Sequence, residues 1–117
     1  MKRKIALIVF LSLVIFSLSY AQVGLRTTGL KTTSQAILAR TGYFYGIEVI
    51  TNGSDSSAVI VYDNASAAAG TVIFQGTIAG SSNFGGAIFN VPIEVKNGIY
   101  VSITSASPNY IVYYKVK

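Results

Sequence analysis

The chain contains no cysteine, no histidine and no tryptophan, and only four of its 117 residues are acidic. Without cysteine and histidine, the sequence excludes a disulfide, a thiolate nucleophile, a Ser-His-Asp triad and the usual ligands of zinc. A site built on paired carboxylates would need half of all the carboxylates in one place. These absences argue against an enzyme, and we expect no catalytic residues, no metal site and no cofactor.

Two aspartates, Asp55 and Asp63, are the candidates for a calcium site. A hard cation needs several oxygen ligands from one shaped loop, and two isolated carboxylates do not provide them. Asp63 and Asn64 directly follow an apolar run at residues 60–62. This pattern is typical of an Asx turn at the end of a strand, and we interpret the two residues in that way.

The N-terminal segment has the pattern of an export signal. Three cations at positions 2–4 precede an apolar run over residues 5–16, and small residues at Ser19 and Ala21 lead to a cleavage point before Gln22. The run is shorter than the ~20 residues that a spanning helix needs. We expect residues 1–21 to be cleaved and the protein to be exported to the periplasm, the cell surface or the medium. A membrane contact would arise only through this segment if it stayed uncleaved.

Most of the positive charge lies in that signal. Three of the nine Lys and Arg residues belong to it, and the other six are scattered among four carboxylates. A basic patch of the kind that binds nucleic acid is therefore not expected. An exported domain of this size without disulfides gains its stability from a dense β core, from association with other subunits, or from both.

Residues 22–117 show the pattern of an all-β protein. Short runs rich in Val, Ile, Tyr, Phe and Thr alternate with clusters of Gly, Asn, Ser and Asp. An extended arm over residues 22–33 brings the number of strands to seven or eight. We predict a domain over residues 34–117 with two packed antiparallel sheets, a β-sandwich that is jelly-roll-like or Ig-like. The seven strands of this domain are predicted at residues 34–39, 43–51, 58–62, 71–78, 87–95, 99–104 and 110–116.

Alternation along these runs assigns the side chains that face the core. Pro92 cannot donate a hydrogen bond to a neighbouring strand, which places it at a sheet edge or a bulge. A three-residue loop of Lys96, Asn97 and Gly98, with Gly98 in the left-handed region, would join two strands as a hairpin that keeps both Val95 and Ile99 inside. The inward residues by this alternation are Tyr45, Ile47, Val49, Val72, Phe74, Ile78, Ala87, Phe89, Val91, Ile93, Val95, Ile99, Val101, Ile103, Tyr110, Val112, Tyr114 and Val116.

Aromatic residues are abundant in the chain, which has eight tyrosines and six phenylalanines, and they are the most informative about function. Exposed aromatics on a sandwich anchor protein interfaces or stack on sugars. Sugar sites usually need several converging polar groups, and tryptophan is absent, so we favour a contact between subunits over glycan binding. The aromatic residues that we expect to lie outward or near strand ends are Tyr43, Phe44, Tyr100 and Tyr113.

The two chain ends indicate how such a protein would assemble. The arm has three large apolar residues, Val23, Leu25 and Leu30, which are too sparse for a core strand. Residues 110–114 form an apolar, β-prone run that pairs with foreign strand edges unless it is protected, and Lys115 follows as a gatekeeper. We expect a homo-oligomer or filament in which the arm of one subunit lies along a sheet edge of the next.

Two stretches of the sequence carry a family resemblance. Ile-Val-Tyr-Asp-Asn-Ala-Ser at residues 60–66, followed by Gly-Thr-Val-Ile-Phe at residues 70–74, resembles a group of small bacteriophage proteins. Asn-Gly-Ile-Tyr-Val at residues 97–101 and Ile-Val-Tyr-Tyr-Lys at residues 111–115 are similar to the C-terminal hairpin of that group. The resemblance spans residues 43–117 and implies a β-sandwich of the head-decoration or tail-associated type in a virion, without enzymatic activity.

The export signal departs from that group, because virion proteins normally assemble in the cytoplasm. It favours an exported relative that belongs to a cell-surface or extracellular assembly. We therefore hypothesise a non-enzymatic structural or interaction protein, with a small secreted carbohydrate-binding module as the alternative.

Overall fold

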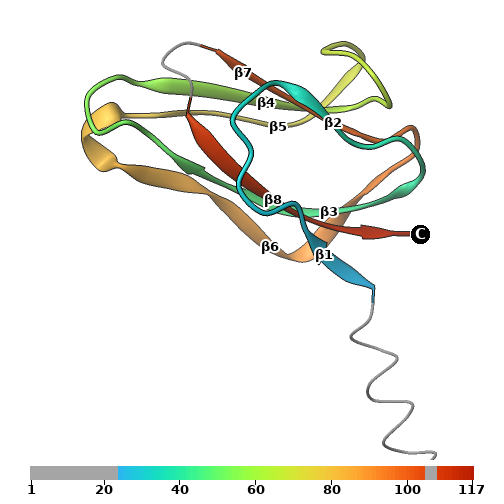
Figure 1. Ribbon diagram of the computed structural model, residues 1–117. Helices are drawn as coiled ribbons and strands as arrows, with labels where there is room; N and C mark the ends of the chain where they lie inside the picture. The colour runs from blue at the N-terminus through green and yellow to red at the C-terminus, as the bar shows by residue number, and fades with distance from the viewer. Residues whose placement is uncertain (1–23, 105–107) are drawn as a thin grey trace, which may run out of the picture.

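The computed structural model describes residues 24–104 and 108–117, which form eight strands in two antiparallel sheets of four strands each (Figure 1). The sheets pack face to face, so the predicted β-sandwich is confirmed. The predicted signal segment and Val23 lie outside the described residues. The strands are β1 (Leu25–Thr27), β2 (Gln35–Leu38), β3 (Gly42–Ile50), β4 (Ser57–Asp63), β5 (Thr71–Ile78), β6 (Phe84–Val95), β7 (Ile99–Thr104) and β8 (Asn109–Val116).

The strand order identifies the topology. One sheet has the order β1-β8-β3-β6 and the other has the order β2-β7-β4-β5. Among the described strands, β4 and β5 alone form a hairpin of consecutive strands, and every other connection crosses from one sheet to the other. This arrangement is the eight-stranded jelly roll, so of the two topologies that the sequence left open the jelly roll is the one observed.

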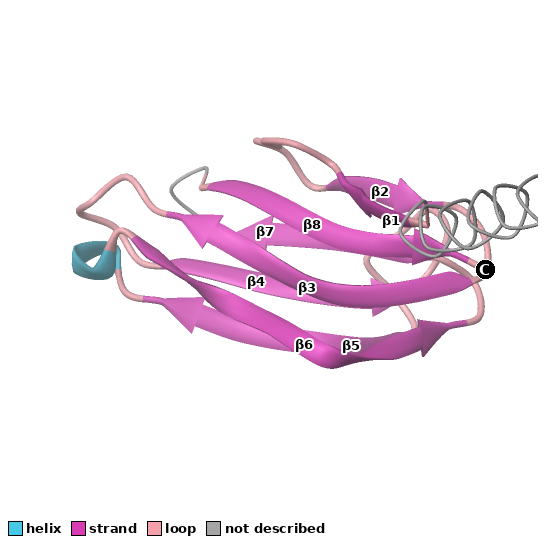
Figure 2. Cartoon of the chain, turned by 90° about the horizontal axis from the view of Figure 1, so that it is seen from below, coloured by secondary structure: helices cyan, strands magenta, loops and turns pink. Residues whose placement is uncertain are grey.

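Each sheet has two edge strands, and they come together in pairs. β1 and β2 lie on one side of the sandwich, and β5 and β6 lie on the other side (Figure 2). Pro92 lies on β6, which confirms its predicted place at a sheet edge. Among the residues with assigned structure, no helix has the length and apolar character that crossing a membrane requires.

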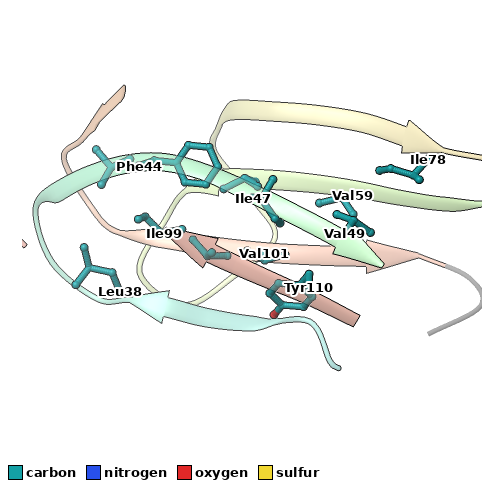
Figure 3. Close-up of a cluster of buried hydrophobic side chains, with 12 residues drawn as sticks. Leu38, Phe44, Ile47, Val49, Val59, Ile78, Ile99, Val101 and Tyr110 are labelled. Carbon is teal, nitrogen blue, oxygen red and sulfur yellow. The ribbon is translucent and has the colours of Figure 1, made fainter. Parts of the chain in front are cut away.

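The core fills the space between the two sheets with aliphatic side chains from both (Figure 3). Phe44 is joined there by the partly buried Phe74 and Phe89, whose rings lie 6.0 to 6.5 Å from one another between centroids. Such contacts stabilise a core by about 0.5–1.5 kcal/mol per pair beyond the area they bury. The fully buried or nearly buried members are Leu38, Phe44, Ile47, Val49, Val59, Val61, Ile78, Val95, Ile99, Val101, Tyr110 and Val112.

A bulge in β3 corrects the prediction for two aromatic residues. The register of β3 against both β6 and β8 shifts between Phe44 and Gly46, so that Tyr45 is an extra residue. The shift reverses the alternation on its N-terminal side. Phe44 is therefore fully buried and not outward, whereas Tyr45 is only partly buried and does not belong to the core.

Similar irregularities in β5 and β6 correct two further predictions. An extra residue in β5, Ile73, turns Val72 outward, where it is 45% exposed. In β6 the register against β3 breaks between Ile88 and Ile93, and Val91 within this break is 82% exposed. Val72 and Val91 were predicted to face the core, and both therefore lie outside it.

The loop of Lys96, Asn97 and Gly98 has the predicted length but does not make a hairpin. β6 and β7 belong to different sheets, and the loop carries the chain across the sandwich. Val95 and Ile99 are both buried because each faces the core from its own sheet. Gly98 has a φ of +151°, and a Cβ atom there would meet the Leu38 carbonyl oxygen, so glycine is required.

The N-terminal arm lies along the edge of its own chain's β8. β1 pairs antiparallel with β8, which confirms that the arm adds a strand. Beyond β1, Thr28 N–H donates to the Val112 carbonyl at 3.1 Å, and Lys31 and Tyr110 exchange two backbone hydrogen bonds of 2.8 Å. The apolar run of β8 is thus covered on both edges, by β1 and by β3.

Candidate functional site

The carboxylates serve as local hydrogen-bond acceptors. The Asn52 amide nitrogen donates to Asp55 at 2.8 Å, and the two oxygens of Asp63 accept backbone N–H groups of the loop that joins β6 and β7. Asn64 makes the predicted Asx turn, since its side-chain oxygen accepts from the N–H groups of Ser66 and Ala67. In the described part of the chain, no group of three or more carboxylates could hold a metal ion.

The predicted interface residues do not gather on one surface. Tyr43, Tyr113 and Leu25 lie on the outer face of the β1-β8-β3-β6 sheet, where Leu25 pairs with Lys115 and Lys115 pairs with Tyr43. Leu30 is more than half exposed in the arm. Tyr100 lies on the outer face of the opposite sheet, and Phe44 lies in the core.

Tyr43 and Tyr113, on the outer face of the β1-β8-β3-β6 sheet, each lie near a charged side chain. The Tyr113 hydroxyl donates to Glu48 at 3.0 Å, and this hydrogen bond to a carboxylate raises the pKa of the tyrosine. Lys117 makes a 2.6 Å ion pair with Glu94, which raises the pKa of the lysine, and its ammonium lies 6.0 Å from the centre of the Tyr43 ring. These contacts leave both tyrosine rings partly exposed, as an interface or a stacking platform requires.

On the opposite sheet, Tyr100 lies directly beside Tyr62 on the neighbouring strand. Tyr62 in turn pairs with Val72 on the edge strand β5. The next row of this face holds Gln75 and Ser102 on either side of Ile60. The face therefore carries two adjacent aromatic rings next to polar side chains.

Two neighbouring edge strands carry exposed apolar side chains that the sequence interpretation missed. We call this the β5/β6 edge and define it by Val72 on β5 and by Phe84, Ile88 and Val91 on β6. These side chains are 45%, 56%, 57% and 82% exposed, respectively. Phe84 and Ile88 project from the outer face of the β1-β8-β3-β6 sheet and Val72 projects from the outer face of the other sheet, so exposed apolar side chains border this edge on both faces of the sandwich.

Contacts between the two strands place them side by side at one edge of the sandwich. The rings of Phe74 and Phe89 lie 6.3 Å apart between centroids, and the Ile78 side chain lies against Gly85. β5 and β6 therefore run alongside each other in opposite directions, which brings Val72 near the level of Val91. At the other end of β6, Phe84 pairs with the partly exposed Ile50 of β3 and extends the apolar surface onto that sheet.

The two strands also lack charged residues of their own over most of their length, although Glu48 of β3 pairs with Gly86 between Phe84 and Ile88. Between Asp63 and Glu94 the sequence has no Lys, Arg, Asp or Glu, and this stretch includes all of β5 and nearly all of β6. Edge strands are normally protected from pairing by charges, prolines or bulges. Here Pro92 and the break around Val91 protect only the C-terminal half of β6, and the run from residue 84 to 88 carries no such protection. The uncharged stretch was the signal in the sequence that could have revealed this surface.

A polar pocket lies on the opposite side, between the arm and β2. Its volume is about 220 Å³, and Thr27, Thr28, Lys31 and Gln35 contribute polar groups to its lining. It holds one cation and no carboxylate in its lining. The pocket does not coincide with any residue that the sequence singled out for binding.

Comparisons with known proteins found nothing similar to this chain. A scan of protein-family models, a search of curated proteins and a search of solved structures found no match for this chain.

Proposed function

We propose that this protein is a non-enzymatic structural subunit, exported from the cell that makes it, which takes its place in a cell-surface or extracellular assembly or in a virion. The observation that carries the proposal is the β5/β6 edge, an uncharged pair of edge strands with four exposed apolar side chains. Exposing such an edge permanently would invite aggregation, so its presence favours a protein that is covered by a partner in its working state.

Two further features support an assembly role. The carboxylates make structural contacts, since Asp63 accepts a hydrogen bond from the loop between β6 and β7 and Glu48 accepts one from the Tyr113 hydroxyl. The jelly roll is also a common architecture of capsid and lectin domains.

Sedimentation of the native protein tests this proposal. Extracts, envelope and medium of the producing cells, and any particles released from them, are separated on a density gradient, and the protein is located with an antibody. We expect it to sediment with a large particle or envelope fraction and to be released by mild denaturant. Sedimentation only as a free small protein in every fraction would contradict the proposal.

A carbohydrate-binding module is the second candidate, and the adjacent rings of Tyr62 and Tyr100 beside Gln75 and Ser102 favour it. Aromatic rings flanked by polar groups are suited to stacking on a sugar and hydrogen bonding its hydroxyls. Binding to a glycan array that Tyr100→Ala abolishes, with the circular dichroism spectrum unchanged, would establish this alternative. Binding that is absent, or that Tyr100→Ala leaves unchanged, would rule it out at this face.

A further inference from the structure

One end of the sandwich carries cations from separate segments of the chain. The Thr41 hydroxyl donates to the Lys96 carbonyl at 3.0 Å, and the Lys117 N–H donates to the Thr41 carbonyl at 3.3 Å. These contacts join the loop before β3, which also contains Arg40, to the loop after β6 and to the C-terminus (Figure 2). β1 lies at the same end, because it pairs with residues 113–115 of β8. We call this the basic end, and its cations are Arg26, Arg40, Lys96, Lys115 and Lys117.

The side-chain charge of the domain is unevenly distributed between this end and the rest. Five cations and two carboxylates, Glu94 and Asp63, give the basic end a net charge of +3. The rest of the described chain has one cation, Lys31, and two carboxylates, Glu48 and Asp55, which give it a net charge of −1. In the sequence the same cations are scattered, and their common position follows only from the topology.

Most of the positive charge at the basic end is accessible to a ligand. Four of the five cations are exposed, and among the described residues only Lys117 of the five makes an ion pair, with Glu94. The partly buried Lys115 lies beside Leu25, an apolar side chain that is 56% exposed. Cations around an exposed apolar side chain suit the headgroup layer of an anionic bilayer, because the charges attract lipid phosphates and the apolar side chain enters the layer below them.

The N-terminal arm also begins at the basic end, where the Lys115 side chain lies against Gly24. The apolar run of residues 5–16 precedes the arm, and residues 17–23 separate the two. These seven residues span at most about 25 Å when fully extended. A membrane that takes up the apolar run, during export or in an uncleaved form, therefore lies within about 25 Å of the basic end.

We infer that the basic end docks on a bilayer that contains anionic phospholipids, with the strands pointing toward the membrane. A nucleic acid presents similar phosphate groups, but the position of the apolar run relative to this end favours the bilayer. The contact goes beyond the proposed function and leaves the β5/β6 edge free.

Two variants of equal net charge test the inference in the protein produced from the full chain. Arg40→Gln combined with Lys96→Gln removes two exposed cations from the basic end. Lys31→Glu also lowers the net charge by two, but Lys31 pairs with Tyr110, six residues along β8 from Val116. At about 3.4 Å per residue this position is about 20 Å from the end of the strand, which exceeds the Debye length of about 10 Å at moderate salt.

Flotation with vesicles measures the binding, using phosphatidylcholine alone and two parts phosphatidylcholine to one part phosphatidylglycerol. We expect binding to the anionic vesicles only, and weaker binding at high salt. Each Lys or Arg near an anionic surface contributes about fivefold in affinity, so the double variant should bind about 25-fold more weakly. Lys31→Glu should bind as the wild type does, and both variants should keep the wild-type thermal unfolding profile.

Three results would overturn the inference: no binding to the anionic vesicles, equal binding to both kinds of vesicle, or equal weakening by the double variant and by Lys31→Glu. Tighter binding to duplex DNA than to the anionic vesicles at equal phosphate concentration would also overturn it, and would assign the basic end to a nucleic acid. None of these results bears on assembly through the β5/β6 edge, so the proposed function is tested separately.

Discussion

At the scale of single residues, Asp63 joins two parts of the chain that are distant in sequence. Its carboxylate oxygens lie 3.1, 2.8 and 3.3 Å from the backbone nitrogens of Lys96, Asn97 and Gly98, so the end of β4 holds the loop that carries the chain from β6 to β7. Burial acts to raise the pKa of this carboxyl, but the three N–H donors and the nearby Lys96 charge outweigh it and hold the pKa below its usual value of 3.8. The charged form is therefore the one that the folded state favours.

Asp63→Asn should lower the free energy of unfolding at pH 7 by about 1–2 kcal/mol, because hydrogen bonds to a charged acceptor are lost. Since the folded pKa is depressed, the contribution of Asp63 is present above the unfolded pKa near 3.8 and is lost as the pH falls through the lower folded pKa. Urea unfolding at pH 7 and at pH 3 measures both effects.

Asp55→Asn is the matched control, because Asp55 accepts a side-chain hydrogen bond from Asn52 within its own loop. It should change the free energy of unfolding much less than Asp63→Asn does. If the two variants were equally stable at pH 7, the bridging role of Asp63 would be wrong.

Tyr110 connects the N-terminal arm to the core. Its ring is fully buried and its hydroxyl donates to the Thr33 carbonyl at 2.7 Å. Burial raises the pKa of Tyr110 to about 12 from 10.0; a hydrogen bond with Gln35 acts in the opposite direction, and the nearby Tyr100 adds to the rise. The neutral phenol is thus the form that the folded state favours.

Tyr110→Phe should cost about 1 kcal/mol at pH 8, because the Thr33 carbonyl loses its donor. Because the folded pKa is raised, the contribution of Tyr110 is complete below pH 10 and is lost as the pH rises through about 12. The unfolding free energy of the wild type should therefore fall more steeply over this range than that of the variant. Denaturant unfolding at pH 8, 10 and 11.5 measures it, and parallel curves would contradict the assignment.

At the scale of strands, alternation in the sequence predicted the elements and most of the core. All seven strands of the domain lie within a few residues of their predicted positions, and Ile47, Val49, Ile99 and Val101 are buried as expected. The errors fall where an extra residue interrupts a strand, at Tyr45, Ile73 and the break around Val91. A bulge depends on which strands lie on either side, and residue alternation within one strand carries no information about that.

Gly46 follows the β3 bulge and tests its importance. It has a φ of +147°, and a Cβ atom there would collide with the Ala87 carbonyl oxygen. Gly46→Ala should therefore destabilise the fold by roughly 2 kcal/mol or more. Gly76→Ala is the matched control, because its Cβ atom would meet only the Phe74 ring at an ordinary 3.6 Å. Thermal unfolding of the two variants compares them, and equal melting temperatures would show that the bulge tolerates a side chain.

The arm protects β8 within its own chain, whereas the sequence suggested a contact with the next subunit. A chain that begins at residue 34 lacks β1 and the Thr33 carbonyl, so the β-prone run of residues 110–114 has a bare edge. We expect this form to unfold more easily than residues 22–117 and to scatter more light as its concentration rises. Equal stability and equal scattering of the two forms would mean that the arm neither stabilises nor shields β8.

At the scale of the whole molecule, two sides of one sandwich have opposite character. The β1/β2 side is bordered by the arm and carries cations, whereas β5 and residues 84–93 of β6 contain no charged residue and expose several apolar side chains. The sequence alone singled out exposed tyrosines and the arm, because these are recognisable by residue type. The β5/β6 edge becomes visible only when the topology places β5 and β6 at the same side and the irregular strands turn Val72 and Val91 outward.

Hydrogen–deuterium exchange at increasing protein concentration tests whether this protein assembles through the β5/β6 edge, since it locates an interface without any substitution. We predict that peptides from β5 and from residues 84–88 of β6 become more protected as the concentration rises, while peptides from β1 and β7 do not change. Protection that increases in β1 and the arm instead, or in no strand at all, would contradict the claim that the β5/β6 edge is the surface through which this protein assembles.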